Sequence, residues 1–232
     1  MRSLFNKYDQ RVSQAHIIRV TGHETSERLA ERCAHSCRSV GQNFQFWEAY
    51  DGTQPGEIRP SRHHSQVMDM IRVTDHYATR SEVAAALSHI SLWAHCAATD
   101  RPIVILEHDA VMLKPYKYHQ VFNSIAFLGS REQTQQGWQV LPTPPHASEG
   151  PNYHFICRAH AYAIDPAVAR SMVAHAIRYG IHAPLDIMIR ADIFPIHQTE
   201  VFAHDQPELD NTTIQGRPRE GRSTTRNDKL EI

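Results

Sequence analysis

Apolar and polar positions follow two different periods along the first part of the chain, and each period predicts its own kind of element. Residues 16–20 are rich in β-branched apolar side chains, at Ile17, Ile18 and Val20, and residues 43–50 alternate. Both patterns are typical of strands. Residues 25–39, between them, carry apolar side chains at helical spacing. The order predicts a β-α-β unit, which a turn at Asp51-Gly52 closes.

The middle of the chain predicts one long helix followed by short buried strands. Residues 54–78 have no steady period and are expected to form an irregular flap with one short helix near 67–71. An apolar stripe then runs at helical spacing from Val83 to Ala97, with Ser81 as the expected N-cap. The apolar runs 103–106 and 125–128 have the length of strands.

The last part of the pattern predicts a strand, a helix and two closing strands. Residues 161–164 lead into a helix in which Asp165 is the expected N-cap and Pro166 the first helical residue, with an end near Gly180. Residues 194–197 and 201–204 have the composition of short closing strands.

Length and charge limit the possible functions. The 232 residues suffice for one domain with a sizeable core, and we expect that domain at 1–216 with a flexible basic tail at 217–232. The net charge of −1 gives no general attraction to nucleic acid or to an anionic membrane. Small-molecule chemistry, with no stable nucleic-acid partner, is therefore expected.

Cysteine usage and the N-terminal sequence bear on the compartment. The four cysteines are scattered and form no disulfide framework or zinc pattern, so free thiols in a reducing compartment are expected. The N-terminus has no apolar signal core, and no apolar run reaches membrane-spanning length. These observations predict a soluble, cytoplasmic protein without a transmembrane segment.

The most informative chemistry lies directly after the apolar run 103–106, where Glu107 and Asp109 flank His108. A strand that ends in carboxylates delivers them to the carboxyl edge of a sheet, where open α/β folds bind nucleotides. Carboxylate oxygens suit Mg²⁺ or Mn²⁺, which can hold nucleotide phosphates. The alternative is an ordinary acidic turn. If strand alternation persists, His108 points away from both acids.

Residues 79–93 together with 103–112 closely resemble the central block of glycosyltransferase family 25, and weaker similarity extends from about residue 17 to 225. Members of that family carry a Glu-Asp-Asp triplet where this chain has His108 in the middle. Further segments that match family motifs are Ser26-Glu27-Arg28, Ala49-Tyr50-Asp51-Gly52, Pro184-Leu185-Asp186 and Arg222-Ser223-Thr224.

The resemblance implies a single α/β domain of the nucleotide-sugar transferase (GT-A) type, with a mixed, mainly parallel sheet flanked by helices. It implies transfer of a sugar, with galactose as a candidate, from a UDP-sugar to an acceptor hydroxyl with inversion. Family members commonly build lipopolysaccharide or glycosylate protein hydroxylysine, so a surface glycan is the first acceptor expected.

The resemblance also assigns candidate roles. Mn²⁺ or Mg²⁺ would bind Asp109, assisted by Glu107 and by a late histidine, His197 or His204. Asp186 is the candidate general base. The candidate donor-binding residues are Arg28, Glu82, Glu107 and Arg222.

Structural alternatives stand beside several of these roles. Arg28 is equally an exposed helix arginine, Glu82 an acid favoured by a helix dipole, and Asp186 a helix N-cap. For Ser88 and His89 we favour buried, hydrogen-bonded structural roles.

Two other functions remain open at the level of sequence. One is a glycosyltransferase that acts on a hydroxylated DNA base, for which the basic tail is the only support. The other is a non-catalytic carbohydrate-binding relative that kept the fold without the full acidic triplet.

Overall fold

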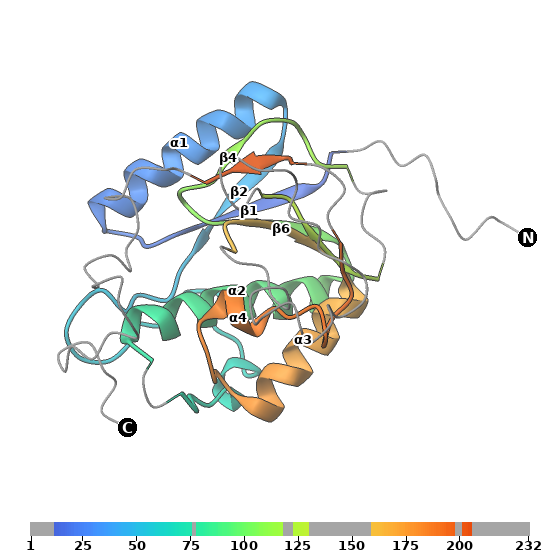
Figure 1. Ribbon diagram of the computed structural model, residues 1–232. Helices are drawn as coiled ribbons and strands as arrows, with labels where there is room; N and C mark the ends of the chain where they lie inside the picture. The colour runs from blue at the N-terminus through green and yellow to red at the C-terminus, as the bar shows by residue number, and fades with distance from the viewer. Residues whose placement is uncertain (1–11, 76–77, 118–122, 130–158, 198–200, 206–232) are drawn as a thin grey trace, which may run out of the picture.

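The computed structural model describes residues 12–75, 78–117, 123–129, 159–197 and 201–205, and the structural statements below concern these residues. Figure 1 shows their arrangement. The strands are β1 (Gln14–Arg19), β2 (Asn43–Glu48), β3 (Ile103–Leu106), β4 (Val111–Met112), β5 (Ile125–Phe127), β6 (Ala161–Ile164), β7 (Ile196–His197) and β8 (Ala203–His204). The helices are α1 (Glu24–Val40), α2 (Arg80–Thr99), α3 (Pro166–Tyr179) and α4 (Leu185–Met188), with a 3₁₀ turn at Met68–Met70.

Six strands form one mixed sheet in the order β2-β1-β3-β6-β5-β7. Strand β1 pairs in parallel with β2 and with β3, and β5 pairs in parallel with β7. Strand β6 runs antiparallel to both of its neighbours, β3 and β5. The predicted mixed, mainly parallel sheet is thus confirmed, and β4 and β8 form a separate antiparallel pair.

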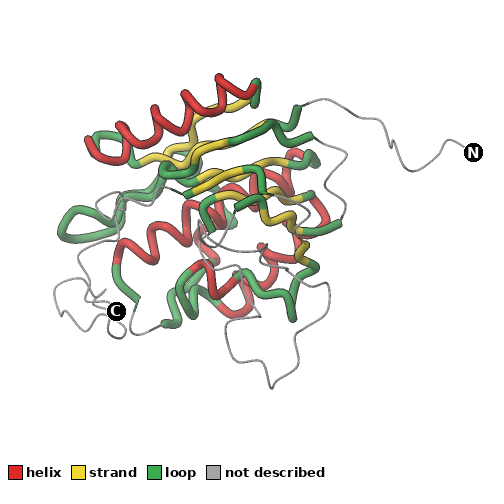
Figure 2. The backbone as a smooth tube through the Cα atoms, turned by 45° about the horizontal axis from the view of Figure 1, so that its top comes forward, coloured by secondary structure: helices red, strands yellow, loops and turns green. Residues whose placement is uncertain are grey.

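Helices cover both faces of this sheet (Figures 1 and 2): α1 lies on one face, and α2, α3 and α4 lie on the other. Strand β3 shows how the sequence supports this arrangement. Its alternate residues Ile103 and Ile105 join the core beneath α2, while Val104 and Leu106 join the core beneath α1. A strand that is buried on both faces has to be apolar throughout, which explains the continuous run.

Local signals place the ends of the helices. Helix α3 begins as expected, because Asp165 Oδ1 accepts hydrogen bonds from Ala167 N at 2.9 Å and Val168 N at 3.2 Å, with Pro166 in the first helical position. It ends at Gly180, whose φ is 71°.

The predicted cap of α2 was wrong by two residues. Thr79, rather than Ser81, is the N-cap, and its Oγ1 accepts from Glu82 N at 3.3 Å. Glu82 Oε2 in turn accepts from Thr79 N at 2.9 Å, which completes a reciprocal capping box. The pattern Thr-x-x-Glu was present in the sequence and outweighs an isolated serine, because it satisfies two terminal N–H groups at once.

Other expectations have mixed outcomes. The expected thiols are confirmed for Cys33, Cys37 and Cys96, which are free and buried. None of the described helices is both long enough and apolar enough to cross a membrane. Cys157, Arg222 and the proposed tail boundary at 216–217 lie outside the described residues.

Candidate functional site

A pocket opens at the carboxyl edge of the parallel strands β1, β2 and β3, next to the first turns of α2. Its empty space, including the open mouth, is about 580 Å³. Apolar walls come from Ile18, Val20 and Ala49. The side chains with polar groups that line it are Tyr50, Thr53, Ser81, Ser88, His89, Glu107, His108 and Asp109.

The turn after β2 forms one wall because the backbone there approaches α2 very closely. A Cβ atom added to Gly52 would lie 2.5 Å from the Arg80 carbonyl oxygen and 3.0 Å from Ala84 Cβ, so only glycine fits. Asp51 Oδ1 accepts from Thr53 N at 2.9 Å and from Thr53 Oγ1 at 2.6 Å. The Asp51-Gly52 motif is therefore a turn that brings the end of β2 against the helix.

Ser88 fastens the same two elements from the helix side. Its Oγ accepts a hydrogen bond from Tyr50 N at 2.9 Å and donates one to Ala84 O at 2.7 Å. Because Ser88 is buried and both of its partners are backbone groups, its contacts are those of a structural residue, as the sequence predicted.

The acidic cluster lies in a turn. Glu107 N donates to His160 O at 2.9 Å, and Ala110 N donates to Glu107 O at 3.1 Å, so the chain reverses directly after β3. Strand alternation stops at Leu106, so it does not set the directions of these side chains. His108 and Glu107 nevertheless diverge as expected, because His108 contacts Ser26 of α1 and Glu107 contacts His89 of α2. All three residues of the cluster line the pocket.

His108 is anchored to the first turn of α1. Its Nδ1 lies 3.2 Å from Ser26 Oγ, and that oxygen also accepts a hydrogen bond from Val20 N at 2.9 Å. Within the segment Ser26-Glu27-Arg28, the contact with the site thus comes from buried Ser26, whereas Arg28 is exposed.

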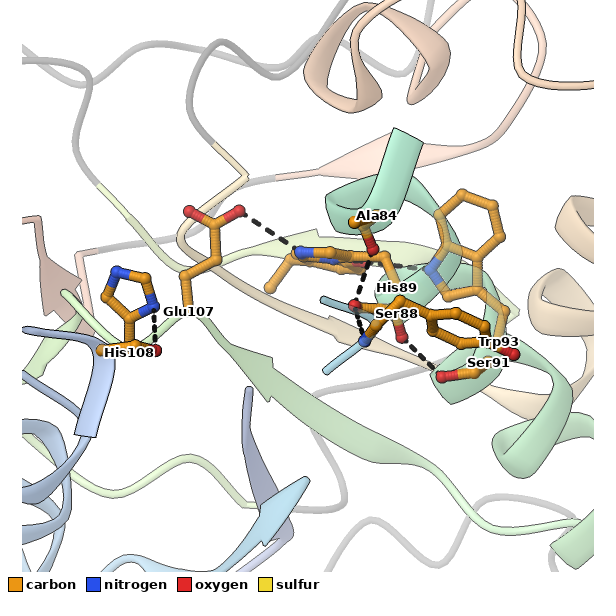
Figure 3. Close-up of polar contacts among 10 residues, drawn as sticks. Ala84, Ser88, His89, Ser91, Trp93, Glu107 and His108 are labelled. Atoms are coloured by element: carbon orange, nitrogen blue, oxygen red, sulfur yellow. Dashed lines mark hydrogen bonds and ion pairs between the residues drawn. The ribbon is translucent and has the colours of Figure 1, made fainter. Parts of the chain in front are cut away.

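Glu107 is held from the opposite side by His89 of α2 (Figure 3). His89 Nε2 lies 3.2 Å from Glu107 Oε1, and His89 Nδ1 lies 2.7 Å from the Tyr162 hydroxyl on β6. Trp93 Nε1 donates to the same hydroxyl at 2.9 Å. The sequence did not indicate this chain of contacts, because His89 and Tyr162 are 73 residues apart.

The histidines around Glu107 determine its charge state. Burial alone would raise the pKa of this carboxyl, but the hydrogen bond with His89 and the electrostatic effect of the imidazoles of His89, His108 and His160 outweigh burial and lower the pKa. Glu107 is therefore an anion at neutral pH, although its side chain is only 33% exposed.

The remaining candidates are not brought into the pocket lining. Glu82 belongs to the capping box, half-buried Asp186 is in the first turn of α4, and half-buried His204 is in β8. The backbone of His197 is in β7. Of the proposed donor and metal residues, Glu107 and Asp109 both line the pocket. Among the described residues, no group of three or more His, Cys, Asp or Glu side chains could hold a metal ion.

A mixed α/β sheet with a polar pocket at the carboxyl edge of its parallel strands is an architecture suited to binding a nucleotide. The family model for glycosyltransferase family 25, described as an LPS biosynthesis protein, matches residues 17–139, which is more than half of the chain. The chain therefore belongs to glycosyltransferase family 25.

Other comparisons add little to this assignment. No curated protein matches the chain. Among solved structures, it is similar to a glycosyltransferase involved in the glycosylation of the major capsid of PBCV-1, with 10% sequence identity and a TM-score of 0.30. That alignment covers 70% of this chain and 65% of the other protein.

Proposed function

We propose that this chain is a glycosyltransferase of the GT-A type, which transfers a sugar from a UDP-sugar to an acceptor hydroxyl with inversion, with the help of a divalent metal. The observation that carries the proposal is the turn after β3, which presents Glu107 and Asp109 to a pocket at the carboxyl edge of the parallel strands. The acceptor we propose is a surface glycan assembled in the cytoplasm, in keeping with the description of the family.

The residues present suit a hard divalent cation that shares its coordination with substrate. Mg²⁺ and Mn²⁺ prefer oxygen ligands, and such sites commonly use one or two carboxylates together with substrate phosphates and water. Asp109 and Glu107 would hold the ion, and diphosphate and water oxygens would complete its shell. When bound, the ion would compensate the negative charge that develops on the departing diphosphate.

The chain's own groups then have separate tasks. The acceptor oxygen forms a bond to the anomeric carbon while the bond from that carbon to the diphosphate oxygen breaks, and the diphosphate leaves with the electron pair. Asp186 is the proposed general base that takes the acceptor proton. This role rests on the match of Pro184-Leu185-Asp186 to the family motif, since Asp186 lies half-buried in the first turn of α4 and outside the pocket lining. A single displacement of this kind inverts the anomeric configuration without a covalent enzyme intermediate.

The proposal can be tested with purified protein and a panel of UDP-sugars, with and without Mn²⁺. We expect one donor to raise the thermal stability and to release UDP slowly, since a ligand that binds only the native state stabilises it. Asp109→Asn should lose most of the turnover while it still folds. Glu31→Gln, an exposed carboxylate on α1, is the matched control and should leave turnover unchanged.

The outcomes separate the proposal from its rivals. Full activity of Asp109→Asn, or of the wild-type protein in chelator, would refute the metal assignment. A donor that stabilises the protein but is never cleaved or transferred would instead support a carbohydrate-binding relative.

A further inference from the structure

A continuous path of polar groups runs through the core to the pocket. It leads from Trp93 Nε1 to the Tyr162 hydroxyl, from that hydroxyl to His89 Nδ1, and from His89 Nε2 to Glu107 Oε1. The side chains of Trp93, Tyr162 and His89 are at most 2% exposed, and Glu107 reaches the pocket. The path thus joins the interior beneath α2 to one carboxylate of the candidate site.

Stability alone does not explain this path. Burying indole, phenol and imidazole groups costs free energy unless each polar atom finds a partner, and aliphatic side chains would avoid the cost. Here the buried polar atoms of Trp93, Tyr162 and His89 all have partners, and both ring nitrogens of His89 are used within the path. Glu107 is the member whose side chain is partly exposed at the pocket. The arrangement therefore specifies the orientation of one carboxylate.

The hydrogen-bonding capacities assign the direction of each bond. An indole N–H can only donate, so the Tyr162 oxygen accepts from Trp93. The phenolic proton then has an acceptor 2.7 Å away in His89 Nδ1, which leaves the imidazole proton on Nε2. From Nε2 that proton is donated to Glu107 Oε1 at 3.2 Å. The ring of His89 is also stacked on that of Tyr162, with centroids 5.7 Å apart and planes 10° from parallel.

We propose that His89 is a positioning residue, which Tyr162 holds in the Nε2–H form so that one oxygen of Glu107 is fixed and the other is presented to the pocket. Figure 3 shows the second carboxylate oxygen on the side away from His89. The catalytic consequence of this inference rests on the proposed function, because only a bound metal or donor makes use of the oriented oxygen. The tautomer of His89 does not depend on that function.

Tyr162→Phe tests the inference, because it removes the one hydroxyl that His89 Nδ1 and Trp93 share and keeps the ring. Tyr116→Phe is the matched control, since Tyr116 is equally buried but belongs to the core beneath α1. The first measurement is the tautomer of His89 in ¹⁵N-histidine-labelled protein, read from two-bond ¹⁵N–¹H correlations. The second is the Mn²⁺ dependence of UDP-sugar turnover, with kcat and KM determined separately.

We expect wild type and Tyr116→Phe to carry the His89 proton on Nε2, and Tyr162→Phe to lose that preference. Loss of a group that orients a ligand typically weakens metal affinity or activity by about 10–100-fold, so Tyr162→Phe should need at least about tenfold more Mn²⁺ for half-maximal turnover. The KM for the acceptor should change little, because in this proposal the path orients a carboxylate that serves the metal and the donor.

Two results would overturn the inference. One is a wild-type spectrum with the proton on Nδ1, which needs no variant. The other is a Tyr162→Phe protein with the same tautomer and the same Mn²⁺ dependence as wild type. If the wild-type protein turns over no UDP-sugar, the proposed function fails, while the spectra still decide the tautomer.

Discussion

Acidification should destabilise the protein through one core histidine, His16 of β1. Its side chain is 1% exposed and lies edge-on to the rings of Trp47 and His95, with centroids 5.5 and 5.3 Å away. Burial, followed by the charge of His95 and more weakly that of His63, lowers the pKa of His16 from 6.5 to about 3. Between about pH 3 and pH 6.5, His16 is therefore neutral in the folded protein while the same histidine is charged in the unfolded chain.

The size of the effect follows from linkage between protonation and folding. The unfolded chain binds a proton at His16 near pH 6.5, whereas the folded chain does so only near pH 3. The unfolding free energy that depends on a neutral His16 is thus fully present above pH 6.5, and it is lost as the pH falls from there toward 3. One pH unit is worth about 1.4 kcal/mol, so the loss at pH 5 should be about 2 kcal/mol.

Urea unfolding at pH 7.5 and at pH 5 measures this loss. His16→Phe keeps an aromatic ring between Trp47 and His95 and removes the titrating group. Wild type should lose about 2 kcal/mol more unfolding free energy than His16→Phe between the two pH values. His35→Gln, an exposed histidine on α1, should behave like wild type. Equal losses in wild type and His16→Phe would show that the pKa of His16 is not lowered in the folded protein, which would refute this prediction.

Three further predictions concern the site. Asp186→Asn should lower kcat by about a hundredfold or more with little change in donor Kd, and a near-normal rate would leave the base unassigned. Gly52→Ala should destabilise by about 1–3 kcal/mol in urea unfolding, because its Cβ would lie 2.5 Å from the Arg80 carbonyl oxygen, and unchanged stability would contradict that close approach. His108→Asp should bind Mn²⁺ more tightly in calorimetric titration, since it adds a third carboxylate to the turn, and unchanged or weaker binding would argue against metal at this turn.

The sequence by itself was sufficient for elements whose determinants lie within a few residues of one another. The buried run 103–106 became β3, and Asp165-Pro166 began α3 as expected, since caps and apolar periods act over one or two helical turns. The two acids after β3 were placed at the pocket because a strand that leaves the core delivers its next residues to the sheet edge.

Contacts between distant segments were decided by the tertiary structure. Strand β6 inserts antiparallel beside β3, and the turn at Glu107 depends on a hydrogen bond with His160 in that same returning chain. Because that turn ends strand alternation, contacts with different helices orient the next side chains: His108 contacts Ser26 of α1, and Glu107 contacts His89 of α2. His89 likewise acquires its role only when β6 supplies Tyr162, because no local pattern encodes a hydrogen bond between side chains 73 residues apart.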